Sequence, residues 1–236
     1  MNCKDKIYRN YGMRLANNDF AVVNMNFRLS SHSKYPAQME DVLYVISFIY
    51  ENADKYKLDI NNMFMAGDSS GAYMSAMTGC IFNNKELRDF YNFDKDINLR
   101  AIASNCGMFD FTTFMGKDIF FPMKRSIVEN LFGAKEYENL DIYRYSSVLK
   151  YINEDFPPIY VMDTEKLSFK NEALRLIEVL NENHIEYLAH IFEKNNKLIH
   201  AFNIMGKHQE SQTVLEEIFD FFKRYVVQDE ITNKSF

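Results

Sequence analysis

Residues 63–76 read MFMAGDSSGAYMSA, an apolar run that leads into two glycines placed around a serine. Gly67 and Gly71 stand two positions before and after Ser69, in a chain that has only eight glycines. In an α/β protein, strand–Gly-x-Ser-x-Gly–helix is typical of a nucleophile elbow, a tight turn that presents the serine hydroxyl at the carboxyl edge of the sheet. We expect both glycines to be required there, because a side chain at either position would collide with the strand or the helix.

The chain on either side of this turn alternates apolar runs with amphipathic segments, which predicts a largely parallel sheet flanked by helices. The run at 20–29 is β-branched and apolar, so we expect a strand buried on both faces. The expected strands cover residues 20–29, 62–69, 99–107, 157–165 and 185–193. The expected helices cover residues 36–56, 70–82, 172–183 and about 209–227.

Residues 108–156 break this alternation. The stretch is rich in aromatic residues and has helical character but no strand signal. We expect it to form a cap or lid over one end of the sheet, inserted between strands of a single domain that spans residues 1–236. Its Met and Phe residues suit an apolar acyl pocket.

Composition and charge narrow the possible functions. The net charge of −6 provides no basic surface for a phosphate backbone, so nucleic acid is not an expected partner. Cys3, Cys80 and Cys106 are widely spaced, which predicts reduced thiols and neither a disulfide nor a metal site. No signal peptide or bilayer-spanning run is visible, so we expect a cytoplasmic protein without membrane association, metal or cofactor.

A serine nucleophile needs a base, and His200 has the best position for one. It follows the last expected strand and precedes the last helix, where a loop would bring it to the edge that carries Ser69. The order Ser then His along the chain agrees with this role. The backbone N–H of Ser70 is the expected oxyanion donor. The other histidines are worse placed: His32, His184, His190 and His208.

Several segments together resemble the hormone-sensitive-lipase-like branch of the α/β-hydrolase esterases. The resemblance rests on FAVVNMNFRLSSHSKYPAQMEDV at 20–42, GDSSGA at 67–72, SNCGMFDF at 104–111, PPIYVMDTE at 157–165 and HAF at 200–202. It implies the α/β-hydrolase fold. It also implies hydrolysis of a small carboxylic ester through an acyl-serine at Ser69, without metal or cofactor.

The chain departs from this family at the triad acid. Leu167 stands where the family has an aspartate. Asp163 and Glu165 lie close by, and either is a candidate to replace it. Asp110 is a third candidate, although a turn or cap is its more usual role. Asp68 is expected to point away from the histidine.

A second departure concerns the first part of the fold. The family's oxyanion loop contains His-Gly-Gly, and this chain has no Gly-Gly pair. We therefore expect an N-terminally truncated fold that lacks its first strands, so that the segments 20–29 and 62–69 either pair directly or leave strand edges unpaired. Such edges favour association, and a homo-oligomer is one expected consequence. The alternative to an esterase is a non-catalytic remnant of an esterase that acts as an interaction protein.

Overall fold

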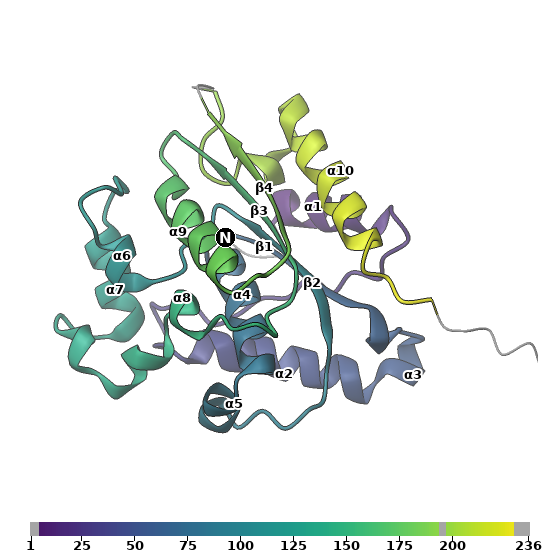
Figure 1. The fold of residues 1–236 in the computed structure, drawn as a ribbon, viewed down its shortest axis with the longest axis horizontal. Helices are drawn as coiled ribbons and strands as arrows, with labels where there is room; N and C mark the ends of the chain where they lie inside the picture. The colour runs from purple at the N-terminus through teal and green to yellow at the C-terminus, as the bar shows by residue number, and fades with distance from the viewer. Residues whose placement is uncertain (1–4, 194–196, 229–236) are drawn as a thin grey trace, which may run out of the picture.

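Four strands form one parallel sheet in the order β1-β2-β3-β4 in this computed structural model, which describes residues 5–193 and 197–228 (Figure 1). Parallel pairing needs a crossover between successive strands, and helices supply each of them here. The strands are β1 (Met63–Asp68), β2 (Leu99–Asn105), β3 (Ile159–Thr164) and β4 (Tyr187–Phe192). All four were expected from the sequence, and their carboxyl ends meet at one edge of the sheet.

Helices cover both faces of this sheet. The α-helices are α1 (Lys6–Ala16), α2 (Ala37–Glu51), α3 (Ala53–Tyr56), α4 (Ser70–Asn83), α5 (Lys85–Tyr91), α6 (Phe111–Phe114), α7 (Lys124–Phe132), α8 (Val148–Tyr151), α9 (Lys170–Glu182) and α10 (Gln209–Lys223). The 3-10 helices are η1 (Ile60–Asn62), η2 (Tyr137–Asn139), η3 (Asp141–Tyr145) and η4 (Phe202–Met205). No helix within the described ranges is long and apolar enough to cross a membrane.

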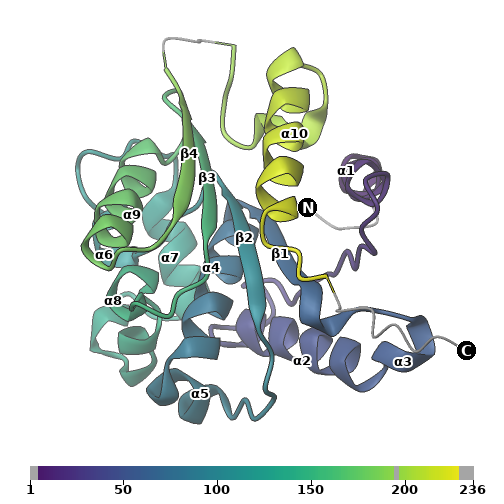
Figure 2. The same ribbon diagram turned by 45° about the vertical axis from the view of Figure 1, so that its right-hand side comes forward.

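The sheet lies between two helical layers (Figure 2). Helices α4 and α9 pack on one face, while α10 packs on the other and α1 lies beyond it against η4. The apolar side of α10 buries Val214, Ile218 and Phe222 with Tyr160 and Met162 of β3. Burial on both faces explains why β2 and β3 read as nearly continuous apolar runs. These two strands are the rigid base of the carboxyl edge.

The segment 20–29 is not a strand, contrary to our expectation. Most of its residues are exposed, including Val22 and Val23. Phe20 packs against Phe64 and Phe222, and the backbone N–H of Arg28 donates to Asp41. Side chains therefore hold the segment, and its β-branched residues find no neighbouring strand with which to form a ladder.

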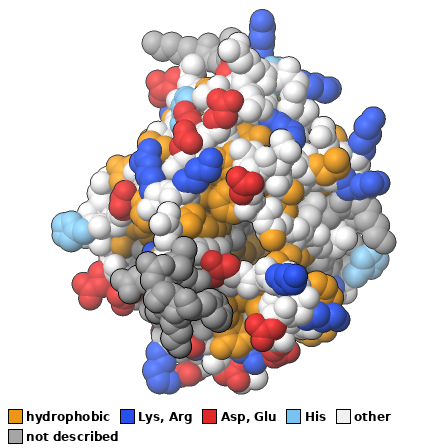
Figure 3. Space-filling view, turned by 90° about the vertical axis from the view of Figure 1, so that its right-hand side faces the viewer, with side chains coloured by type: hydrophobic (Ala, Val, Ile, Leu, Met, Phe, Trp, Pro, Cys, Tyr) orange, Lys and Arg blue, Asp and Glu red, His pale blue; other side chains and the backbone are white. Residues whose placement is uncertain are grey.

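One edge of the sheet is open. Among residues 5–193 and 197–228, β1 pairs with β2 alone, and its side chains are only partly buried. On the side of the molecule formed by α10, α1 and α3, hydrophobic side chains gather among charged ones (Figure 3). Of the two expected arrangements, the segment 20–29 does not pair with β1 as a strand in the part of the chain that the structure describes, and the edge of β1 is unpaired there.

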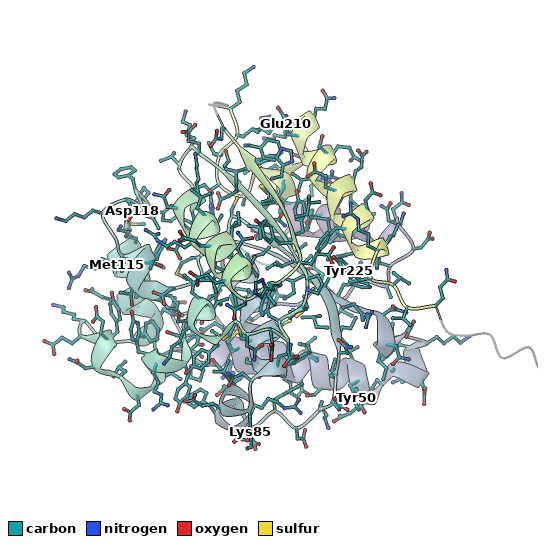
Figure 4. The ribbon with its side chains drawn as sticks, in the orientation of Figure 1. Tyr50, Lys85, Met115, Asp118, Glu210 and Tyr225 are labelled. Atoms are coloured by element: carbon teal, nitrogen blue, oxygen red, sulfur yellow. The ribbon has the colours of Figure 1, made fainter. Side chains whose placement is uncertain are left out.

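Residues 108–156 contain three short α-helices and two 3-10 helices and no strand, in agreement with their composition. Glu172 of α9 fastens the beginning of this stretch: its buried carboxylate accepts from the backbone N–H groups of Phe109 and Asp110, at 3.1 and 3.2 Å. Asp118 lies beside α9 (Figure 4), where Asn171 donates to its carboxylate and Arg175 pairs with it. The segment is therefore attached to the helix that follows β3.

Candidate active site

Ser69 occupies the turn between β1 and α4 with φ 55° and ψ −115°. Such a backbone is strained for a residue with a side chain, and strain of this kind persists only where the surroundings enforce it. A Cβ on Gly67 would lie 2.2 Å from the carbonyl carbon of Gly71, so only glycine fits at position 67. Gly71 differs from our expectation, because a Cβ there would meet no heavy atom within 4 Å.

The turn leads directly into the first residue of α4. Ser70 is exposed and begins the helix, so its backbone N–H is among the first-turn donors that lack an intrahelical acceptor. The space beside Gly71 is open, whereas the next two residues of α4, Ala72 and Tyr73, are buried. A developing negative charge on an atom attached to Ser69 would meet the positive end of the helix dipole.

His200 lies on a short loop between β4 and η4 that three contacts hold in place. Thr164 Oγ1 at the end of β3 donates to the carbonyl of Leu198, at 3.1 Å. An isolated parallel bridge joins Lys166 to Ile199. The backbone N–H of Ala201 donates to Cys106 Sγ, at 3.4 Å. The loop therefore ends against the carboxyl end of β2.

Ser69 and the loop of His200 both contact the carboxyl end of β2. The backbone N–H of Ser69 donates to the carbonyl of Asn105, at 2.9 Å, and the next residue, Cys106, contacts the loop of His200. The structure gives no hydrogen bond between the Ser69 hydroxyl and the His200 ring. In ligand-free enzymes this bond is often long and tightens only when substrate binds.

Asp163 lies within β3 and is completely buried. Adjacent strands are about 4.8 Å apart, so the backbone of β3 lies two strand spacings, about 10 Å, from that of β1, the strand that ends just before Ser69. Its Oδ1 accepts from the backbone N–H of Thr164 at 2.7 Å. Burial raises the pKa of Asp163 to about 7, and the Ser168 hydroxyl and the Thr164 N–H partly offset that effect.

The residue that sequence reasoning missed is Ser168. Its hydroxyl donates to Asp163 Oδ1 at 2.5 Å, and Ser168 Oγ also lies 3.2 Å from His200 Nδ1. Ser168 is 9% exposed and immediately precedes the residue that caps α9. The sequence feature that pointed to Ser168 is its place directly after Leu167, the position where the resemblance places the acid.

The other carboxylates lie elsewhere. Glu165 is exposed and lies 4.0 Å from the ammonium of Lys170. Asp110 caps α6 by accepting from the backbone N–H groups of Thr112 and Thr113. Asp68 accepts from Tyr8 Oη at 2.9 Å, away from the histidine, and burial raises its pKa.

Aromatic side chains surround the imidazole. The rings of Phe169 and Phe121 have centroids 4.6 and 5.5 Å from that of His200. Burial lowers the pKa of His200 to about 4, so the ring is neutral at pH 7 and able to accept a proton. Phe121 belongs to the segment 108–156, which therefore reaches the candidate site.

The remaining histidines and thiols have other surroundings. His190 Nδ1 on β4 lies 2.9 Å from a carboxylate oxygen of Glu217, and His208 is the residue before α10. Cys80 and Cys106 are free and buried, and burial raises the pKa of each thiol. Cys3 lies outside the described residues.

Residues 2–169 match the sequence pattern of the family named BD-FAE. The match includes Ser69, Asp163 and Ser168, and it ends before His200.

Two esterases of Mycobacterium tuberculosis are among the relatives. Esterase LipQ is 25% identical over 145 residues, which cover 61% of this chain and 34% of LipQ. The probable carboxylic ester hydrolase LipM is 21% identical over 204 residues, which cover 85% of this chain and 46% of LipM. The chain thus spans less than half the length of these relatives.

Solved structures share the fold. Esterase B from Lactobacillus rhamnosis, crystallised with an inhibitor, superposes with a TM-score of 0.79 at 22% identity. The superposition covers 92% of this chain and 71% of that one. A truncated carbohydrate esterase from gut microbiota gives a TM-score of 0.73 at 17% identity, covering 91% of this chain and 77% of that one. The expected α/β-hydrolase fold is therefore confirmed.

Proposed function

The chain belongs to the BD-FAE family of α/β hydrolases, within the hormone-sensitive-lipase-like group, and on that premise we propose that it hydrolyses small carboxylic esters. The observation that carries the proposal is the strained backbone of Ser69 between β1 and α4, together with a neutral His200 held at the same edge of the sheet. Relatives that are named as esterases support it.

In the proposed reaction the Ser69 hydroxyl attacks the carbonyl carbon of the ester while His200 Nε2 takes the hydroxyl proton. The tetrahedral intermediate collapses when the protonated imidazole gives this proton to the departing alcohol oxygen, which leaves an acyl group on Ser69. Water then attacks the acyl carbon, His200 again acting as base, and the carboxylic acid departs. Asp163 is the proposed acid of the triad.

The oxyanion of each tetrahedral intermediate needs donors close to Ser69. We assign the backbone N–H of Ser70 as one donor because it begins α4 next to the nucleophile. The family that the chain resembles takes a second donor from a His-Gly-Gly loop, and this chain has no Gly-Gly pair. One missing donor typically lowers kcat by about 10²–10³-fold, so slow turnover is the expected outcome for this chain.

The segment 108–156 is the proposed cap over the acyl group. It is fastened to α9 through Glu172 and places Phe121 against His200. The rings of Phe121 and Phe169 form an apolar wall, which suits a short acyl chain better than a charged substrate. A structure of esterase B was obtained with a tributyrin phosphonate, so a butyryl ester is a reasonable first substrate.

The proposal is tested by reaction of the purified chain with a fluorescent alkylphosphonate and by turnover of p-nitrophenyl butyrate. Labelling and turnover that both disappear in Ser69→Ala support an esterase. A folded protein that reacts with neither reagent contradicts it. The second candidate, a non-catalytic interaction protein, is favoured by one observation, the open edge of β1.

That edge leads to an expected association of two copies by pairing of their β1 strands. Sedimentation velocity over a range of concentrations should then show a dimer, and Ala66→Lys should shift it toward monomer, because a charged side chain on an edge strand opposes pairing. Ala66 is exposed within β1, so the substitution leaves the core intact. A monomer at every concentration would contradict this association without affecting the esterase proposal.

A further inference from the structure

A serine joins the carboxylate and the imidazole of the candidate triad. Ser168 Oγ lies 2.5 Å from Asp163 Oδ1 and 3.2 Å from His200 Nδ1, whereas the structure gives no hydrogen bond between Asp163 and His200 themselves. We propose that Ser168 is a positioning residue through which Asp163 orients the base, so that the site is a tetrad of Ser69, His200, Ser168 and Asp163. This inference rests on the proposed roles of Ser69 and His200.

The number of protons fixes the direction of the two hydrogen bonds. A serine hydroxyl has one proton to donate and two lone pairs that accept. An ionised carboxylate can only accept, so the short contact with Asp163 uses the proton of Ser168. Ser168 Oγ then faces His200 as an acceptor, and Nδ1 of the ring must carry a proton. The lone pair of the neutral ring is therefore on Nε2, the nitrogen that takes the proton from the nucleophile.

The local backbone explains why a serine occupies this place. Leu167 has φ 48°, a left-handed conformation that a leucine seldom adopts, and its side chain is 44% exposed. The next residue, Ser168, is buried between Asp163 and His200. The turn between β3 and α9 thus leaves position 167 at the surface and brings the hydroxyl of position 168 to the ring.

The chain of hydrogen bonds from Asp163 through Ser168 to His200, here called the relay, differs in its electrostatics from a direct carboxylate–imidazole pair. An inserted hydroxyl moves the negative charge of Asp163 farther from the ring, which weakens its attraction for the imidazolium formed during the reaction. The low pKa of His200, caused by burial, agrees with weak stabilisation of the charged ring. The arrangement therefore controls the tautomer of His200 more than the stability of its charged form.

A double-mutant cycle tests whether Asp163 acts through Ser168. Asp163→Asn and Ser168→Ala should each lower kcat/KM for p-nitrophenyl butyrate by about a hundredfold or more, with little change in KM. The double variant should be no slower than Ser168→Ala, because the carboxylate has no other route to the ring. Ser168→Thr keeps a hydroxyl and should restore most of the rate. Losses that multiply in the double variant would overturn the relay.

A spectroscopic readout tests the relay without turnover. At a pH well above 7, where Asp163 is ionised, nitrogen-15 spectra of the imidazole side chain should show His200 as the Nδ1–H tautomer in the native protein and in Ser168→Thr. Ser168→Ala should lose that preference and move toward the Nε2–H form. A native ring with its proton on Nε2, or a tautomer that Ser168→Ala leaves unchanged, contradicts the proposal.

Ser146→Ala is the matched control for both measurements. Ser146 is also buried, and its hydroxyl donates to a backbone carbonyl, that of Tyr143, at 2.6 Å. It should lose comparable stability and leave the tautomer of His200 unchanged. The two proposals fail separately: a chain that neither reacts with phosphonate nor turns over ester is not an esterase, while the imidazole spectra still decide whether Ser168 orients His200.

Discussion

Tyr8 Oη donates a 2.9 Å hydrogen bond to Asp68 Oδ2, which joins the first helix to the residue before the candidate nucleophile. The two residues are 60 positions apart in the chain. Burial raises the pKa of the Asp68 carboxyl, and the Tyr8 hydroxyl opposes that effect. Helix α1 is therefore joined, through Asp68, to the turn that carries Ser69.

We expect Tyr8→Phe to lower the free energy of unfolding by about 1 kcal/mol, because it removes a hydrogen bond to a largely buried carboxylate. The pKa of Asp68 should rise further in this variant. Urea denaturation at pH 7 measures the first effect. Tyr44→Phe is the matched control, since Tyr44 is 74% exposed, and it should leave stability unchanged. Equal stability of the two variants would mean that the Tyr8 contact contributes nothing.

The two glycines of the elbow should respond differently to alanine. Gly67→Ala places a methyl group 2.2 Å from the backbone of Gly71 and should prevent native folding or leave an insoluble chain. Gly71→Ala has open space and lies in the first turn of α4, so it should raise stability by up to about 1 kcal/mol. Thermal unfolding followed by circular dichroism distinguishes them. Similar damage from both substitutions would contradict the open space beside Gly71.

Phe121 should control the titration of His200. Phe121→Ala removes one aromatic ring from beside the imidazole and admits water, so the pKa of His200 should rise from about 4 toward its ordinary value near 6.5. The chemical shift of the ring, followed by NMR as the pH changes, gives this value. Phe120→Ala is the matched control because that neighbouring side chain is 77% exposed. An unchanged pKa in Phe121→Ala would mean that the segment 108–156 does not shield the site.

The pH dependence of turnover follows from Asp163. Its pKa is raised to about 7, so the carboxyl is protonated below this pH and ionised above it. We expect kcat/KM to rise as the pH increases through about 7 and then to level off. His200 loses its proton near pH 4, so its titration does not account for a change of kcat/KM near pH 7. The groups that contact the Asp163 carboxyl are the Ser168 hydroxyl, the backbone N–H groups of Thr164 and Phe169 and the thiol of Cys106, and none of them carries a charge at this pH.

Asp163→Asn is the variant that identifies the group responsible. It cannot ionise, so the limb near pH 7 should disappear and the rate should remain low throughout. A limb that persists in this variant would assign the titration to another group. A native profile that rises near pH 4 alone would mean that the ionisation of Asp163 does not matter for turnover.

Local sequence patterns predicted most of the fold, since each of the four strands carries an apolar run bounded by turn residues. The strand expected at 20–29 was wrong for a reason that no local pattern contains. Its residues suit a strand, but a strand also needs a partner, and pairing is a property of the whole sheet. Gly71 shows the same limit, because the space around a residue depends on distant segments.

At the candidate site, sequence order placed Ser69 and His200, but it could not locate Ser168. The residue becomes noticeable only when the left-handed backbone of Leu167 is known, since that conformation decides which of two neighbours faces the histidine. The spacing of residues in the sequence cannot tell which of two neighbouring residues in a turn, 167 or 168, faces the histidine. The choice among Asp163, Glu165 and Asp110 was likewise left open by the sequence, and burial and contacts favour Asp163.

The two hydrogen bonds of the Ser168 hydroxyl run in one direction: His200 donates to Ser168, and Ser168 donates to Asp163. When Asp163 gains a proton it becomes a donor, and the hydroxyl that it contacts can turn its own proton toward the ring. Nδ1 then accepts, the ring proton resides on Nε2, and no lone pair is left for the nucleophile. A proton on Oδ1 therefore reverses both bonds, whereas a proton on Oδ2 leaves Oδ1 able to accept from Ser168 as before. The state of the base thus depends on which of the two oxygens of Asp163 takes the proton.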